Sequence, residues 1–286
     1  MKRSLLVIAS LLLLGNAYGQ KEKIKGNKIV STEEHNVDGF HTIEIYESFE
    51  VTFEESSDSQ VKIEADSNLQ EVIKIEVVDS VLKIYSDKDL RRAKALNLDI
   101  SYGSELKRIM LYDKVNAKSL SPITGSELTV EVNDNAEVFL TTETNKVSCT
   151  TNGKASAELH VNATEVTYQI NENSEMKGII TTENLNVDLY QKASVEIEGE
   201  AQSMRVRADN DSDFYGQKLN AAKTILIAEN SSDCYILTNE EITMEVRDKS
   251  EVFLLGEPKI NVEVFTNEAS LYKKEIDYVP SKLRLN

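Results

Sequence analysis

"VNDNAEVFL" (Val132–Leu140) returns almost unchanged as "VRDKSEVFLL" (Val246–Leu255), 114 residues further along the chain. The small residue Ala136 marks a position that recurs throughout this region. Its equivalents are Val115, a degenerate first member, and then Ala155, Ser174, Ala193, Ser212, Ser232, Ser250 and Ala269. Successive separations are 21, 19, 19, 19, 19, 20, 18 and 19 residues. Nine copies at so constant a spacing predict a repeat protein, and the two opening phrases are six repeats apart.

Aligned on this marker, the copies place an apolar residue at every second position. Two positions after the marker stand Ala117, Val138, Ala157, Met176, Val195, Phe214, Cys234, Val252 and Leu271. Four positions before it stand Leu111, Val132, Thr151, Ile170, Leu189, Ala208, Ala228, Val246 and Phe265. Six positions before it the column is also mostly apolar, until Glu263 breaks the rule. A period of two predicts strands with one buried face, and a slip of one residue would turn every column outward.

Each repeat is therefore expected to contain two short strands joined at a tight corner just before the marker. The corner residues are Asp134, Gly153, Gln191, Asn210, Asn230, Asp248 and Asn267. Most of these residue types tolerate positive φ and bond their own backbone, as a corner requires. A second polar corner is expected half a repeat away, as in "TTETNK" (141–146) and "TTENLN" (181–186).

A unit this small cannot bury its own apolar face, so successive copies must stack. The leucine-rich repeat pattern is missing, and a left-handed hexapeptide helix would need three small corners per turn. We therefore predict an all-β protein, a right-handed parallel β-helix (solenoid) of about nine 19-residue coils. A long antiparallel meander of hairpins is the remaining alternative.

The chain divides into five expected segments. Residues 1–19 have the charged start, short apolar stretch and small cleavage-site residues of a signal peptide. That apolar stretch is too short to span a bilayer. The remaining segments are an N-terminal extension (20–35), a strand-rich N-terminal cap (36–95), the β-helix coils (96–275) and a C-terminal tail (276–286) that covers the far end.

Charge excludes two classes of partner. The formal net charge is −17, which disfavours nucleic acid and anionic lipid because both reward a basic surface. We expect an exported protein without a membrane span, in the periplasm or at the cell surface. The acidity is expected to serve solubility more than calcium binding.

The segments "VDGFHTIEIYESFEVTFEES", "LKIYSD", "LNLDISYGSELKRIMLYD" and the late "LLGEPKI" resemble the auto-transporter adhesin head, or GIN, domain family, which is common in Bacteroidetes. The likeness covers roughly residues 37–260. It differs at the corners, where this chain has "NDNAE", "NGKAS" and "RDKSE" in place of Gly-Ser-Gly-type sequences. The resemblance implies a right-handed β-helix and an exported or surface location, and it brings no catalytic residues. Fold alone does not give function.

Residues for catalysis or metal binding are scattered. His35, His41 and His160 form no nucleophile or metal pattern, so no catalytic residue, metal site or cofactor is expected. Polysaccharide lyases share the β-helix and need clustered acids with a basic residue. The corner acids Asp113, Asp134, Glu172 and Asp248 are spread along the coils, and we expect Arg205, Arg207 and Arg247 to form ion pairs.

The two cysteines, Cys149 and Cys234, fall in inward columns on different strands. They are four coils apart, which is about 19 Å at the spacing of neighbouring strands. A disulfide needs Cα atoms within about 7 Å. We therefore expect no disulfide and two buried free thiols.

An unusual column lies three positions after the marker, where side chains should face water. It contains Phe139, Tyr215, Tyr235, Phe253 and Tyr272, and the last four belong to consecutive coils. One interpretation is cross-strand stacking that supports the sheet. The other is an exposed aromatic strip that binds a glycan or a cell-surface protein.

Together these features predict an exported, non-enzymatic β-helical envelope or surface protein. Its expected role is adhesion, glycan binding or scaffolding. The alternatives are a β-helical polysaccharide lyase and a purely structural envelope protein. A lyase would present a groove where basic and acidic side chains converge.

Overall fold

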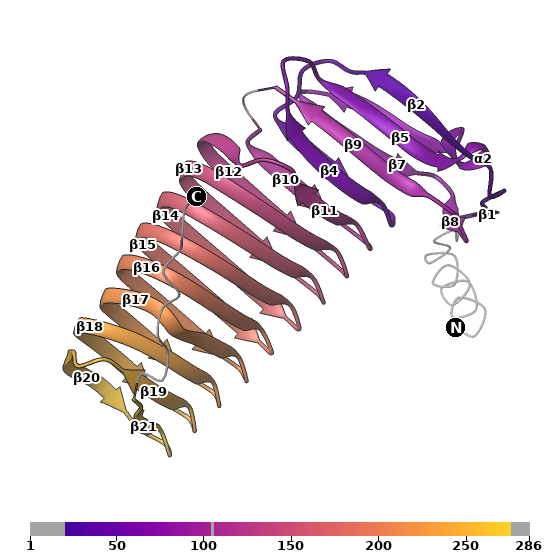
Figure 1. Cartoon of the computed structure of the whole chain (residues 1–286). Coiled ribbons are helices and arrows are strands. Elements are labelled where there is room, and N and C mark those ends of the chain that lie inside the picture. The colour runs from indigo at the N-terminus through magenta and orange to yellow at the C-terminus, as the bar shows by residue number, and fades with distance from the viewer. Residues whose placement is uncertain (1–20, 104–105, 276–286) are drawn as a thin grey trace, which may run out of the picture.

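The chain forms a long stack of parallel coils joined to a strand-rich cap (Figure 1). A computed structural model of the protein describes residues 21–103 and 106–275. The expected signal peptide (1–19) and C-terminal tail (276–286) lie outside these residues. The predicted parallel β-helix is confirmed, as a solenoid of about nine turns of about 19 residues each. The parallel pairing of successive coils excludes the antiparallel meander.

Most coils are one long strand, where two short strands were expected. The coil strands are β10 (Arg108–Leu111), β11 (Asn116–Ser119), β12 (Ile123–Val132), β13 (Glu137–Thr151), β14 (Ser156–Glu172), β15 (Glu175–Gln191), β16 (Ser194–Asp209), β17 (Asp213–Ala228), β18 (Asp233–Val246), β19 (Glu251–Leu255), β20 (Lys259–Phe265) and β21 (Ser270–Lys273). From β13 to β18 the strand continues through the second polar corner and is interrupted only at the tight one. The second corner is therefore a bend within an extended strand, and we call it the wide corner.

The wide corner also explains how alternation survives an odd repeat length. Along β13 the inward residues follow every second position up to Thr144, but the next inward residue is Val147. Asn145 and Lys146 between them both face solvent. One step of three residues per coil, with all other steps even, makes a period of 19 compatible with inward columns that stay in line.

The tight corners adopt the left-handed conformation that their residue types suggested. Backbone φ is 62° at Asp134, 76° at Gly153 and 69° at Gln191. A Cβ atom on Gly153 would lie 2.9 Å from the carbonyl oxygen of Asp134, so glycine relieves both strain and crowding there. Glu172, whose column position was occupied by an acid in the sequence, has φ of 63° as well.

The repeat columns are the pairing register of the structure. Val138 pairs with Ala157, and Ala157 with Met176, each 19 residues on. The apparent exception at Glu263 is corrected by a register shift. Met244 pairs with Val262, and the next pair is Glu245 with Val264, which leaves Glu263 outside the ladder and exposed. The bulge keeps an apolar residue at the inward position.

The cap contains the remaining elements. They are β1 (Lys23–Lys25), β2 (Val30–Asn36), β3 (Thr42–Ile45), β4 (Glu50–Glu55), β5 (Gln60–Asp66), α2 (Ser67–Gln70), β6 (Ile73–Val78), β7 (Val81–Ser86), β8 (Asp89–Arg91) and β9 (Leu96–Tyr102). β1 pairs with β8, and β2 pairs antiparallel with β5, so the expected N-terminal extension (20–35) supplies two strands of the cap.

A further rung of the solenoid is built into the cap. β3 lies parallel to β10, and β4 lies parallel to β11, so the first coil stacks directly on this pair. Glu47 between β3 and β4 has φ of 76°, which matches the tight corners of the later coils. The repeat search missed this rung because β5 to β9 follow it in sequence and because bulky Phe49 occupies the small marker position.

A buried carboxylate fastens the N-terminal strands to the cap. Asp66 is fully buried and accepts backbone N–H groups from Lys28 at 2.7 Å, Lys94 at 2.7 Å and Ala95 at 3.2 Å. Burial opposes ionisation of this carboxyl, but the three donors outweigh it and lower its pKa. Asp66 thereby joins three segments of the cap around one charge.

Candidate functional surfaces

Four of the five aromatic residues singled out in the sequence stack on the outer face of the last coils. Tyr215, Tyr235, Phe253 and Tyr272 lie in register on β17, β18, β19 and β21. Successive ring centroids are 5.4, 4.3 and 5.1 Å apart, with interplanar angles of 25°, 14° and 14°. These four residues are called the aromatic ladder below.

Stacking determines which part of each ring meets solvent. The centroid separations match the spacing of neighbouring strands, about 4.8 Å. Tyr235 and Phe253 therefore have a ring on each face, and their outer edges remain accessible. Tyr272 ends the ladder and is 43% exposed. The ladder offers a partner a rim of ring edges rather than a row of flat faces.

Phe139 occupies the same column but does not join the ladder. Glu158, Lys177 and Glu196 stand between it and Tyr215 on successive coils. Its ring meets His160 edge-on, with centroids 5.1 Å apart and planes at 76°.

An acidic column runs beside the ladder. Asp213 pairs with Asp233, and Asp233 pairs with Glu251, so three carboxylates line up two positions before three of the rings. Burial raises the pKa of Asp233, and the carboxylates of Asp213 and Glu251 raise it further. The ladder is bordered by negative charge, which favours partners that carry basic groups beside apolar ones.

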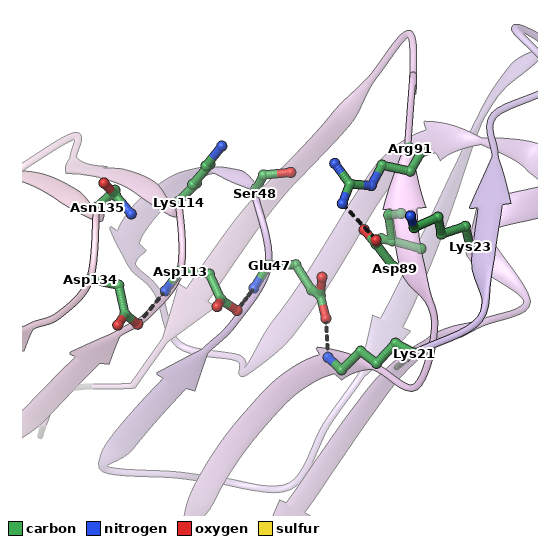
Figure 2. Close-up of a pocket in the computed structure, with 11 residues that line it drawn as sticks. Lys21, Lys23, Glu47, Ser48, Asp89, Arg91, Asp113, Lys114, Asp134 and Asn135 are labelled. Atoms are coloured by element: carbon green, nitrogen blue, oxygen red, sulfur yellow. Dashed lines mark hydrogen bonds and ion pairs between the residues drawn. The ribbon is translucent and has the colours of Figure 1, made fainter. Parts of the chain in front are cut away.

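A pocket of about 670 Å³ lies where the cap meets the first coils (Figure 2). Its walls come from the N-terminal strand segment, from β8, and from successive tight corners at Glu47, Asp113 and Asp134. The basic lining residues are Lys21, Lys23, Arg91 and Lys114, and the acidic ones are Glu47, Asp89, Asp113 and Asp134. We call it the junction pocket.

Most of the junction pocket's acids already have partners. The Nζ atom of Lys21 lies 2.6 Å from a carboxylate oxygen of Glu47. The carboxylate of Asp113 accepts the backbone N–H of Glu47 at 2.9 Å, and that of Asp134 accepts the N–H of Asp113 at 3.0 Å. Burial raises the pKa of Glu47, Lys21 opposes this, and Asp113 and Asp89 add to it. These contacts join the N-terminal segment to the corners.

Sequence reasoning missed the junction pocket. Only the corner column, with Asp113 and Asp134, was visible as a pattern. Lys21 reaches the pocket because β1 pairs with β8, and no repeat position signals that pairing.

A shallow polar groove follows the wide corners. Two adjoining hollows of about 480 and 210 Å³ share Thr181, Thr182 and Gln202. Hydroxyl and amide side chains dominate the lining, with four glutamates, and no lysine or arginine of the described residues takes part. The sequence showed these residues as polar corners but gave no sign that they enclose a groove.

The arginines singled out in the sequence form ion pairs, as predicted. Arg205 lies 3.2 Å from Asp188, and both Arg207 and Arg247 contact Glu229, at 3.5 and 2.7 Å. Within residues 21–103 and 106–275, no group of three or more His, Cys, Asp or Glu side chains is placed to hold a metal ion. Cys149 and Cys234 are both buried free thiols.

The profile of the family described as "Putative auto-transporter adhesin, head GIN domain" matches residues 39–179 and 156–258. The matches together span more than half of the chain. The chain belongs to this family. The GIN-domain match begins at β3, in the rung built into the cap, and ends in the last coil. Across the part of the chain that the structure describes, no helix is long and apolar enough to cross a bilayer.

Solved structures share the GIN-domain fold of this chain. A "putative adhesin" from Parabacteroides distasonis is 16% identical with a TM-score of 0.66, over 88% of this chain and 100% of that one. A "putative adhesin" from Parabacteroides merdae is 18% identical with a TM-score of 0.65, over 88% and 99%. A "putative lipid binding protein" from P. distasonis is 17% identical with a TM-score of 0.61, over 88% and 100%. A search of curated proteins found no match.

Proposed function

We propose that this GIN-domain protein is exported and acts without catalysis as an adhesin-like surface protein, which binds a cell-surface protein or a glycan through the aromatic ladder. The family and the adhesin descriptions of its structural neighbours support the general role. The observation that carries the binding surface is the unbroken stack Tyr215–Tyr235–Phe253–Tyr272 on an otherwise polar outer face.

The geometry favours a protein partner over a sugar among these ligands. Stacking of a sugar ring on an aromatic side chain uses the ring face, and the faces of Tyr235 and Phe253 are covered by neighbouring rings. The exposed rim presents apolar edges beside the carboxylates of Asp233 and Glu251. A protein surface with apolar groups next to lysine or arginine matches both features.

The ladder is tested by replacing its two inner rings. Tyr235→Ser/Phe253→Ser should abolish binding of the mature protein to cells of the surrounding community, and to any glycan identified on an array run with and without calcium. Phe139→Ser is the matched control, because it lies in the same column but outside the ladder. Thermal unfolding of both variants checks that the fold persists.

Each outcome separates a different interpretation. Loss of binding in the double variant alone supports the ladder. Unchanged binding moves the contact elsewhere, and Thr182→Val/Gln202→Ala in the wide-corner groove then tests that surface for glycan. Absence of binding by the unaltered protein favours the purely structural envelope role.

The junction pocket favours a second candidate function, a polysaccharide lyase, because basic and acidic side chains converge there. A lyase base removes the proton beside a uronate carboxylate, a carbon–carbon double bond forms, and the glycosidic C–O bond breaks as the leaving oxygen gains a proton. Lys114 is the base candidate at this pocket. Ultraviolet absorbance of an unsaturated product, lost in Lys114→Ala, would establish the activity. Its absence across acidic polysaccharides supports the non-enzymatic role.

A further inference from the structure

The C-terminal end of the solenoid is an uncovered apolar surface. Here β20 and β21 pair with β18 and β19 on one side and with no described strand on the other. The exposed apolar side chains of this last coil are Ile260 (47%), Val262 (48%), Phe265 (45%), Leu271 (36%) and Tyr272 (43%). Four of these line a hollow of about 540 Å³. In the preceding coil, their partners Met244, Val246 and Val252 are fully buried.

The other end of the solenoid shows what is missing. There the parallel ladders end in the antiparallel strands β2, β5 and β6, so the first coils are fully covered. The last coil keeps the apolar interior of a middle coil together with an open backbone edge. An edge of that kind pairs readily with any available strand.

We propose that residues 276–286 of the same chain cover this end by adding a strand alongside β20. The segment begins at the uncovered coil, since β21 ends at Lys273. Eleven residues can extend to about 36 Å, more than the roughly 23 Å of the seven-residue β20. The sequence "IDYVPSKLRLN" provides Ile276, Tyr278, Val279, Leu283 and Leu285 as apolar side chains.

The pattern within this segment suits an outermost strand. Lys282, Leu283, Arg284 and Leu285 alternate basic with apolar residues, so two leucines can face the exposed interior while two cations face outward. Pro280 has no backbone N–H, which proteins accept at a sheet edge and which hinders pairing with a further strand.

Charge selects this segment over a second copy of the protein. The last coil exposes Glu263 and Glu268, and the formal net charge of the chain is −17. End-to-end docking of two copies would bring like charges together. Lys282 and Arg284 instead place positive charge beside these acids. The inference does not depend on the proposed adhesive function.

Hydrogen exchange of the β20 amides tests the proposal. The mature full-length protein is compared with Leu283→Asp/Leu285→Asp and with a truncation after Glu275. Ser281→Asp/Asn286→Asp is the matched control, because it adds the same two charges without touching the leucines. We expect β20 exchange to accelerate about tenfold or more in the leucine variant and the truncation, and to stay unchanged in the control. β15 exchange should be constant throughout.

Two results would overturn this assignment. One is equal β20 exchange in all four proteins. The other is protection that survives truncation and increases with protein concentration, which would identify a second copy as the cover. Addition of a synthetic 276–286 peptide should restore β20 protection in the truncated protein, and failure to do so while the full chain is protected would also count against the added strand.

Discussion

At the residue scale, single side chains hold segments that the repeat does not connect. Asp66 is the clearest case, since one buried carboxylate gathers backbone N–H groups from Lys28, Lys94 and Ala95. Nothing in the alternation of β5 marks this position as different from its neighbours. Its role follows only from the loops that surround it in the folded cap.

Asp66→Asn is expected to destabilise the protein by roughly 1.5–3 kcal/mol at pH 7, the usual value of hydrogen bonds to a charged group. Because the folded-state pKa is lowered, the contribution is complete above the ordinary carboxyl pKa of about 4 and is lost as pH falls through the lowered value. Urea unfolding across pH 3–8 measures it. Asp38→Asn, at an exposed position, is the control. Equal stability of both variants at pH 7 would contradict the account.

The two thiols allow a second test at this scale. Burial raises the pKa of Cys149 to about 12 and also raises that of Cys234. Neither should react with a thiol reagent at pH 8 in the native protein, and both should react in denaturant without reductant. A requirement for reductant would reveal a disulfide, and rapid native labelling would show that these coils open.

At the element scale, the columns of the repeat predicted the register because each inward residue is fixed by its counterparts above and below. The aromatic stack and the arginine ion pairs were predictable for the same reason. The rung formed by β3 and β4 was not, since 66 residues separate Phe49 from Val115, its equivalent in the next coil. The wide corner was misread as a strand break because its polar residues resemble a turn, while the backbone there stays extended.

The same register creates repulsion in the acidic column. Asp233→Asn is expected to stabilise the protein by roughly 0.2–1 kcal/mol at pH 7, because it removes a like charge between Asp213 and Glu251. The raised pKa means that the folded state holds the proton more tightly, so the gain should vanish as pH falls through that value. Thermal unfolding at pH 7 and pH 4 measures the difference.

Asp188→Asn is the matched control for this prediction. Asp188 also lies on a coil strand, but it pairs with Arg205 at 3.2 Å. Its replacement should not stabilise the protein, and a gain similar to that of Asp233→Asn would show that neighbouring carboxylates are not the cause.

At the scale of the whole molecule, each coil contacts mainly its two neighbours, so length is a variable that the fold tolerates. The cap and the first coils share one continuous hydrophobic core. The junction pocket could not be predicted because it combines the N-terminal segment with corners from the cap and the coils. Surfaces that arise from a single column were predictable, and surfaces that combine distant segments were not.

Removal of one whole coil should leave a folded protein. Deletion of residues 157–175 joins Ser156 to Met176 and keeps every column in line, since both flanking residues retain their inward or outward position. Deletion of 157–174, one residue fewer, shifts the alternation and should abolish cooperative unfolding. Circular dichroism and urea titration compare the two. Equal behaviour of both deletions would show that register does not govern this fold.

The stacked tyrosines give the molecule optical probes at both ends. The chain has no tryptophan, so its near-ultraviolet absorption comes chiefly from 11 tyrosines. Tyr46 and Tyr112 stack at 4.6 Å beside the cap, while Tyr215 and Tyr235 stack towards the far end. Closely coupled chromophores in a fixed orientation produce circular dichroism that disappears when either pair separates. Loosening at one extremity can therefore be followed spectroscopically without attaching a label.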